Sequence, residues 1–207
     1  MKDYVQEIDK CERRYLTVEL RAPKEGRMVD GYAAKFNTDS ELFYGAWYER
    51  IAPGAFDDVL GDDSVALFNH DPNLILARNK VTMTITQDET GLRYQFEAPN
   101  TTVGNDLLEN LKNGNVRSSS FAFTVKSEEW TYSEDKSKPS VRTIKKIERL
   151  YDVSPVTYPA YPDTSVGRRA FDGIKNELEA KHKAEQDRTI KMFQIQHEIF
   201  LLKQSTK

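Results

Sequence analysis

The chain has 207 residues, 38% of them hydrophobic and 30% charged, which is long enough for one domain with a buried core and an appended segment. Lys and Arg total 30 against 33 Asp and Glu, a net charge of −3. This balance argues against nucleic acid as the main partner, because phosphate binding needs a concentrated basic surface. No apolar run reaches the roughly 18–20 residues that span a bilayer, and the first fifteen residues are too charged for a signal peptide. The single cysteine, Cys11, excludes an internal disulfide and a cysteine-rich zinc site. We therefore expect a protein of a reducing cytoplasm that needs no cofactor and binds neither nucleic acid nor membrane.

The first third of the chain predicts β structure interrupted by turns. Residues 15–22 (YLTVELRA) and 27–36 (RMVDGYAAKF) predict two strands joined by a turn that contains Pro and Gly. Residues 54–60 predict a short helix. Residues 65–71 (VALFNHD) predict an apolar strand that stops at Asp71, because the proline that follows cannot donate to a ladder and restricts the residue before it.

The middle of the chain carries the clearest patterns. In residues 80–98 apolar and polar residues alternate on both sides of a turn at 88–91, which predicts an antiparallel hairpin. Residues 103–114 place three leucines on one helical face and end in Gly114, which predicts a helix and its stop.

Two further strands are predicted at 121–132 and 141–151, separated by a polar insertion. After about residue 165 the composition shifts to helix formers, with an apolar seam near the end of the chain. The sequence thus predicts a mostly β (α+β) body over residues 1–168, with few helices, and a charged helical tail over residues 169–207. The tail either mediates assembly, by pairing with another subunit or by binding scaffold, or packs on the body.

Of the three histidines, His70 is the candidate for chemistry. His182 and His197 lie in the charged tail, where we expect ordinary solvent-facing side chains. His70 comes at the end of a predicted apolar strand, beside a turn imposed by proline. An imidazole anchored in this way and open on one side suits a general base, which needs fixed geometry as well as a pKa near neutrality. The alternative is an ordinary histidine at a strand end.

Three consecutive serines, residues 118–120, precede an alternating apolar run. Alternation places Phe121 and Phe123 on the core face and Ser120 on the opposite face, whereas Ser119 shares the face of the phenylalanines. A nucleophile must be held within hydrogen-bond reach of its base. Ser120, fixed by its buried neighbour and facing away from the core, is therefore the best placed of the three. The alternative is a run of small polar residues at the start of a strand.

A carboxylate follows in the segment from Leu150 to Asp163. Asp152 is predicted near the end of a strand and just before a Ser-Pro turn. A carboxylate in that position would orient an imidazole and stabilise its charged form. The alternative is an aspartate that caps the turn.

Five segments, in order along residues 12–168, carry a resemblance to a known family. They are GYAAKFN (31–37), ERIAPGAF (49–56), LFNHD (67–71), VRSSSFAF (116–123) and LYDVSPVTYPAYPDT (150–164). Together they resemble the tailed-bacteriophage prohead (capsid maturation) protease family. The resemblance implies a serine endopeptidase with an antiparallel β-barrel of the herpesvirus-protease type, flanked by a few helices.

The resemblance also implies a role for each candidate residue. The serine of the family falls on Ser120, its histidine on His70 and its acidic third member on Asp152. Family members commonly carry Gly where this chain has Ala122, seldom have a serine triplet, and usually have Glu where this chain has Asp152. We expect backbone amides near Ser120 to form the oxyanion hole. Arg168 and Arg169 are a second option for stabilising the oxyanion. The alternative is that they form a basic start to the tail helix.

The function that follows is cleavage of capsid and scaffold precursor proteins during prohead maturation. The expected substrates are the major capsid protein precursor and the scaffold, and self-cleavage and a homo-oligomeric state are further expectations. The expected location is the assembling prohead in the host cytoplasm. The alternative is a non-catalytic capsid-assembly module that retains the fold. A small-ester hydrolase lacks support because the chain has no Gly-x-Ser-x-Gly motif. Metal catalysis lacks support as well, because one histidine in the body cannot supply the usual cluster of metal ligands.

Overall fold

The computed structural model describes residues 11–17, 20, 26–43, 45–133, 135, 138–158, 180, 183, 188, 191 and 192. The chain divides into two compact units, residues 1–162 and 163–207. The described residues of the second unit are helical. The expected boundary between residues 168 and 169 lies outside the described residues and remains a prediction.

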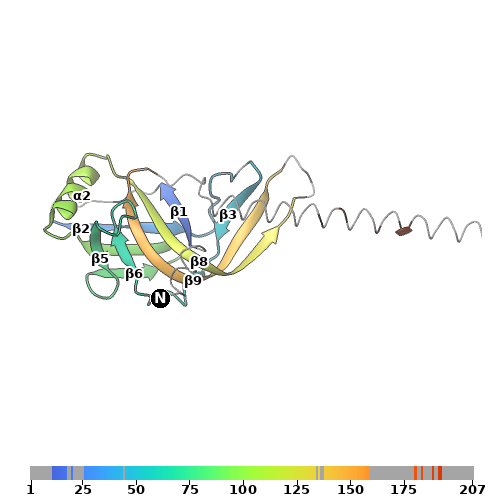
Figure 1. The fold of residues 1–207 in the computed structure, drawn as a ribbon, viewed down its shortest axis with the longest axis horizontal. Helices are drawn as coiled ribbons and strands as arrows, with labels where there is room; N and C mark the ends of the chain where they lie inside the picture. The colour runs from blue at the N-terminus through green and yellow to red at the C-terminus, as the bar shows by residue number, and fades with distance from the viewer. Residues whose placement is uncertain are drawn as a thin grey trace, which may run out of the picture. The chain divides into compact units, whose positions relative to one another are not determined.

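The larger sheet of the first unit has six strands (Figure 1). Its order is β1 (Glu12–Thr17), β8 (Ser118–Thr131), β9 (Ser140–Val156), β4 (Val65–Leu67) and β5 (Ile75–Arg78), and β3 (Trp47–Ile51) also pairs with β9. β8 and β9 form a long antiparallel hairpin, whose register runs from Ser118 opposite Val156 to Thr131 opposite Val141. β3 pairs parallel with residues 140–144 of β9, and β4 pairs parallel with β9 near its other end. β9 is therefore the strand that connects most of the sheet.

The smaller sheet contains three antiparallel strands in the order β2 (Met28–Lys35), β7 (Gly91–Glu97) and β6 (Met83–Gln87). The hairpin predicted over residues 80–98 is confirmed by β6 and β7. In its turn the Asp88 carboxylate accepts hydrogen bonds from the backbone N–H groups of Thr90 and Gly91, at 2.7 and 3.1 Å. Glycine is required at position 91 because a Cβ there would lie 1.9 Å from the Ala34 carbonyl oxygen.

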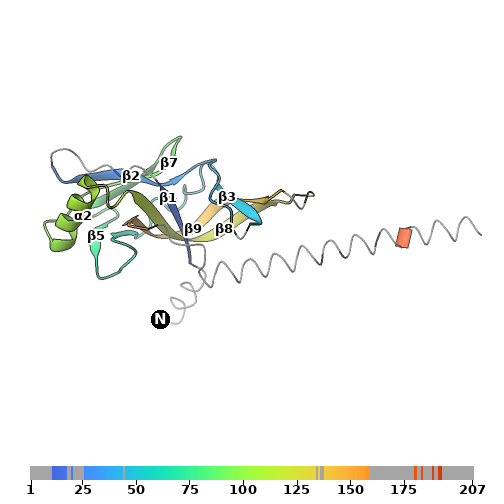
Figure 2. The ribbon, with the colours of Figure 1, turned by 90° about the horizontal axis from the view of Figure 1, so that it is seen from above.

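Helix α2 (Thr102–Lys112) confirms the helix predicted from the leucine pattern. The Thr101 side chain caps its first turn by accepting from the Gly104 N–H, and Gly114, at φ 71°, follows its end. The buried face consists of Leu107, Leu108 and Leu111. In both views α2 lies at the end of the unit next to β5 (Figures 1 and 2).

One hydrophobic core joins the two sheets. The smaller sheet contributes alternate residues such as Leu92, Tyr94 and Phe96, while their polar neighbours face outward. The larger sheet contributes Phe121 and Phe123, whose stacked rings lie 4.7 Å apart. The core assignment of these two phenylalanines from alternation is confirmed, and it sets which way each serine before them points.

Three predictions about local structure were wrong. Residues 54–60 form successive turns rather than a helix, because Gly54 adopts φ 76° and the buried Phe56 and Val59 pack on the core from these turns. The strand predicted over 65–71 ends at Leu67. The first strand begins at Glu12 rather than at residue 15, and it pairs with β8, a long-range partner that a local turn signal does not report.

The described part of the first unit is mostly β and contains the helix α2, as the sequence predicted. The pairings among the described residues form two separate sheets and include none that closes a barrel. The closed barrel expected from the resemblance therefore remains a prediction.

Candidate active site

All three serines lie inside β8, which begins at Ser118. The predicted start of this strand at residue 121 was wrong, because β1 pairs with the three serines on one side and β9 on the other. Ser118 is 4% exposed, and Ser119 and Ser120 are 0% exposed. The triplet is thus a buried piece of strand and not a solvated entry to it.

The alternation of the strand separates the two buried hydroxyls. Ser119 points into the core, where its Oγ lies 2.9 Å from the Tyr94 hydroxyl. Burial raises the pKa of Tyr94, so this phenol stays protonated and is no base. Ser120 points to the other face, where its Oγ lies 2.6 Å from Nε2 of His70. The predicted orientation of Ser120 is correct, although its side chain is covered rather than exposed.

His70 lies in a tight turn after β4 and not at the end of the strand. Its φ is 60°, in the left-handed region, where a residue other than Gly has a conformational strain of about 1–3 kcal/mol. The turn is tied to the end of β9 by two hydrogen bonds: the Asn69 N–H donates to the Pro155 carbonyl at 3.0 Å, and the Thr157 N–H donates to Oδ1 of Asn69 at 2.9 Å. These bonds hold the strained turn over β9, so the imidazole reaches both neighbouring strands.

Asp152 lies within β9, opposite Ala122 of β8 and Val65 of β4. The strand continues to Val156, so Asp152 does not cap a turn as the alternative reading required. Its Oδ1 lies 2.7 Å from Nδ1 of His70 and accepts a hydrogen bond from Ser154 Oγ at 2.6 Å. The three candidates from different parts of the sequence therefore meet in one place.

The geometry supports proton transfer along one line. A carboxylate accepts only, so Nδ1 of His70 carries the hydrogen that faces Asp152, and the lone pair of Nε2 faces Ser120. The side chains of His70 and Asp152 are 11% and 8% exposed. This nearly dry environment strengthens their attraction. The arrangement is able to take a proton from the Ser120 hydroxyl and stabilise the resulting imidazolium.

Two neighbours of the site were not anticipated from the sequence. Ser154 stands two residues after Asp152 on the same face of the strand, so alternation alone could have suggested it. The backbone carbonyl of Arg14 lies 3.0 Å from Ser120 Oγ. It belongs to β1, more than one hundred residues away, and no local pattern points to it.

Arg168 and Arg169, the second option for oxyanion support, lie outside the described residues. Among the residues that the structure describes, no cluster of three or more His, Cys, Asp or Glu side chains could hold a metal ion. Within the same residues, no helix has the length and apolar character needed to cross a membrane.

The chain matches a protein family and is similar to a solved structure. The model of the family described as "Caudovirus prohead serine protease" matches residues 16–180. The capsid assembly protease gp21 of bacteriophage T4 is similar with a TM-score of 0.43 and 12% sequence identity, over 72% of this chain and 98% of that chain. No curated protein matches this chain.

The family match covers well over half of the chain and defines its class, a protease of phage capsid maturation. More particularly, the chain belongs to the caudovirus prohead serine protease family. The resemblance derived from the five sequence segments is thereby confirmed.

Proposed function

We propose that the protein is a serine endopeptidase in which Ser120 is the nucleophile, His70 the general base and Asp152 the residue that orients His70. Its substrates are the precursors of the major capsid protein and the scaffold, and it acts inside the assembling prohead in the host cytoplasm. Self-cleavage and a homo-oligomeric state belong to the same proposal.

One observation carries the proposal: the hydrogen-bonded chain from Asp152 through His70 to Ser120. Its two contacts measure 2.7 and 2.6 Å, within the range that a nucleophile and its base require. The three residues come from β9, the turn after β4, and β8, so packing and not sequence proximity brings them together. Ser119 is not part of these linked hydrogen bonds, since its hydroxyl bonds to Tyr94 in the core.

The mechanism follows from the atoms in contact. Nε2 of His70 takes the hydroxyl proton as Oγ of Ser120 forms a bond to the carbonyl carbon of the substrate. The imidazolium then gives this proton to the leaving amine as the C–N bond breaks, which leaves an acyl-enzyme. Water, deprotonated by the same imidazole, then attacks the acyl carbon. The ester bond between that carbon and Oγ breaks, the carboxylic product leaves, and the imidazolium returns its proton to Oγ of Ser120. Asp152 keeps the hydrogen of the neutral ring on Nδ1 and stabilises the imidazolium through Nδ1–H.

Stabilisation of the oxyanion is part of the proposal, at about 10²–10³ in rate per donor. Backbone N–H groups near Ser120 are the first choice, and Arg168 and Arg169 are the second. The barrel of the herpesvirus-protease type is likewise proposed. It would require strand pairing between the two sheets beyond the pairings of the described residues.

The test is co-expression of the chain with its capsid precursor, with Ser120→Ala and Ser118→Ala compared against the wild type. We expect Ser120→Ala to lose on the order of 10⁶ in turnover, because the nucleophile and the base act as a unit. Ser118→Ala should process the precursor, because Nε2 of His70 hydrogen-bonds to Ser120, which this variant keeps. Equal processing by Ser120→Ala and the wild type would remove Ser120 from the mechanism.

A non-catalytic assembly module is the second candidate, favoured by one observation: Ser120 has no exposed surface. An enzyme in this state requires a rearrangement before substrate reaches Oγ. If neither the folded wild type nor any variant cleaves the precursor inside assembling proheads, the second candidate replaces the first.

A further inference from the structure

The first strand runs along the edge of β8 beside the candidate nucleophile. β1 pairs with β8 from Glu12 opposite Phe123 to Thr17 opposite Ser118, which places Tyr15 directly opposite Ser120. Both views show β1 next to β8 (Figures 1 and 2). The main chain of β1 also touches the reacting atom, since Ser120 Oγ lies 3.0 Å from the Arg14 carbonyl oxygen.

This contact competes with the base for a single hydrogen. A serine hydroxyl has one hydrogen to donate, and a carbonyl oxygen accepts only. When the hydroxyl donates to the carbonyl of Arg14, at 3.0 Å, it does not donate to Nε2 of His70, at 2.6 Å. The Arg14 carbonyl therefore favours an orientation of the Ser120 hydroxyl that is unproductive for proton transfer.

The same arrangement leaves no room for a substrate. A peptide carbonyl carbon has to approach Oγ to about 3–3.5 Å before it reacts. Ser120 is 0% exposed, and the main chain of residue 14 occupies one side of its oxygen. A segment of the protein itself stands where part of a substrate would have to come.

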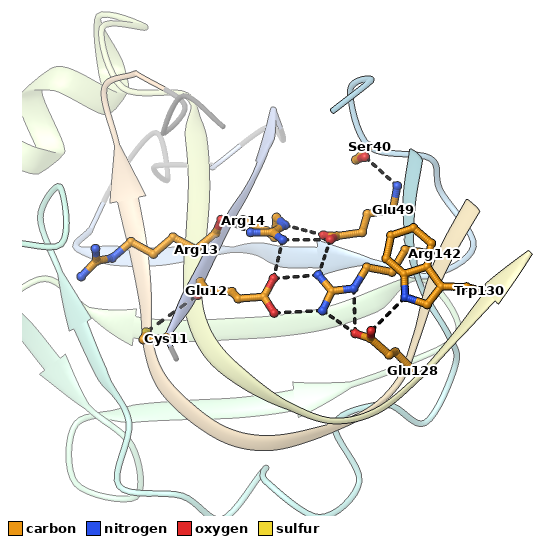
Figure 3. Close-up of polar contacts among 9 residues, drawn as sticks. All are labelled: Cys11, Glu12, Arg13, Arg14, Ser40, Glu49, Glu128, Trp130 and Arg142. Carbon is orange, nitrogen blue, oxygen red and sulfur yellow. Dashed lines mark hydrogen bonds and ion pairs between the residues drawn. The ribbon is translucent and has the colours of Figure 1, made fainter. Parts of the chain in front are cut away.

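A cluster of charged side chains surrounds β1 at this position (Figure 3): Glu12 and Arg14 of β1, Glu49 of β3, Arg142 of β9 and Glu128 of β8. Arg14 of β1 bonds Glu49 of β3 through Nε and through Nη2, the latter at 2.8 Å. Glu12 of β1 accepts two hydrogen bonds from Arg142 of β9, at 2.8 and 2.9 Å. Arg142 also donates to Glu128 of β8. Glu12 and Arg14 thus form an ionic clamp that ties β1 to β3 and β9.

We propose that β1 is an internal blocking strand, held over Ser120 by the ionic clamp, and that an extended segment of the substrate takes its place along β8 when it is displaced. This inference rests on the proposed function of Ser120. β1 is the edge strand of its sheet, so its removal breaks one ladder and exposes the edge of β8. An exposed edge of this kind accepts an extended peptide as an added strand.

A clamp made of ion pairs suits a removable strand. The free-energy cost of removing charged groups from water offsets much of the attraction between them. Such ion pairs therefore fix the position of a strand more than they stabilise the fold. Competition by a substrate strand that brings its own main-chain hydrogen bonds is then a near-balanced exchange. The enzyme would stay latent until precursor is concentrated around it.

The first test measures how fast a fluorophosphonate probe labels the full-length protein. Glu12→Gln removes the carboxylate that ties β1 to Arg142 and leaves two arginines facing two glutamates, so no arginine of the cluster is left in excess of carboxylate. We expect labelling about tenfold faster than the wild type, since the rate follows the fraction of molecules in which β1 is displaced. Glu128→Gln is the matched control, because it removes a carboxylate from the same arginine without touching β1. It should label at the wild-type rate.

The second test locks the strand. In a Cys11→Ser background, Thr17→Cys and Ser118→Cys introduce cysteines at two positions that are Cα partners in the register of β1 and β8. The oxidised protein should resist labelling, and reduction should restore the rate of the Cys11→Ser parent. If the reduced protein stays unlabelled, the double substitution has damaged the site. The labelling rates of Glu12→Gln and Glu128→Gln then decide whether β1 blocks Ser120.

The results separate this inference from the function on which it rests. Equal labelling of Glu12→Gln and Glu128→Gln, or rapid labelling of the oxidised protein, overturns the blocking strand even if Ser120 carries the label. A label that survives Ser120→Ala overturns the proposed nucleophile instead, whatever the clamp variants do.

Discussion

Two donors converge on one oxygen of Asp152. Nδ1 of His70 lies 2.7 Å from Oδ1, and the hydroxyl of Ser154 donates to the same atom at 2.6 Å. Ser154 is 0% exposed, so no water replaces its hydrogen bond when it is lost. The hydroxyl therefore fixes the rotation of the carboxylate against the imidazole, which makes Ser154 a positioning residue in the proposed mechanism.

Replacing Ser154 with Ala should lower kcat about 10- to 100-fold, the usual worth of a hydrogen bond to a charged group. KM should stay near its wild-type value, because Ser154 contacts Asp152 and not the substrate. Steady-state kinetics on a peptide from the capsid precursor measures both. A rise in KM with kcat unchanged would show that Ser154 acts on substrate binding, contrary to this reading.

At the residue scale, alternation in the sequence was sufficient to select Ser120 over Ser119. The fixed pleat of a strand turns parity into direction, and the buried phenylalanines define which direction is the core. Burial of Ser120 was not predictable in this way. It depends on β1, whose pairing with β8 is a long-range choice, and on the strained turn that brings His70 over the strand.

At the scale of elements, Glu49 is the residue through which β3 joins the clamp. It is 4% exposed and bonds both Arg14 and Arg142. Burial alone would raise the pKa of this carboxyl, but the two guanidinium groups outweigh burial and hold its pKa below the usual value of 4.5. Because the pKa is depressed in the folded state, the stability that Glu49 contributes is present above about pH 4.5 and is lost as the pH falls through the folded value.

Replacing Glu49 with Gln should therefore lower the free energy of unfolding by about 3 kcal/mol at pH 7, because it leaves buried guanidinium charge less well paired. Urea unfolding from pH 7 to pH 3 measures the effect. The difference between the variant and the wild type should shrink below pH 4.5. Glu129→Gln, which removes an exposed partner of Lys145, is the control and should change little at either pH. A difference that is constant with pH would contradict the role given to the Glu49 charge.

The sequence correctly predicted those elements whose turn, cap and periodicity signals all lie within one short stretch. The β6–β7 hairpin has its turn residues and both alternating strands within twenty residues, and α2 carries its cap, its apolar face and its glycine stop in one stretch. β3 and β5 were missed because their sequences, WYERI and ILAR, do not alternate between apolar and polar residues. The segment 54–60 failed because packing of Phe56 in the core outweighed helix propensity.

At the scale of the whole molecule, the family match runs from residue 16 to residue 180, beyond the end of the first unit. We propose that the tail, residues 169–207, binds another subunit or the scaffold and so brings the enzyme into the prohead. The sequence did not distinguish this role from packing on the body, because a helical pattern identifies the apolar face of a helix but not what that face binds.

Removal of residues 169–207 distinguishes the two roles of the tail. If the tail binds a partner, the shortened protein should keep its melting temperature and its labelling at Ser120, yet process far less precursor in co-expression. If the tail packs on the body, the melting temperature should fall by several degrees, as a loss of about 1 kcal/mol produces in a domain of this size. Thermal unfolding followed by the processing assay gives the answer.

One of three adjacent serines is proposed as the nucleophile, and a covalent adduct identifies which one. The protein is treated with a fluorophosphonate, digested, and the peptide that contains residues 118–120 is sequenced by mass spectrometry. We expect an adduct on Ser120, absent from His70→Ala and from protein labelled after denaturation. An adduct on Ser118 or Ser119, or labelling that does not depend on His70, would contradict it.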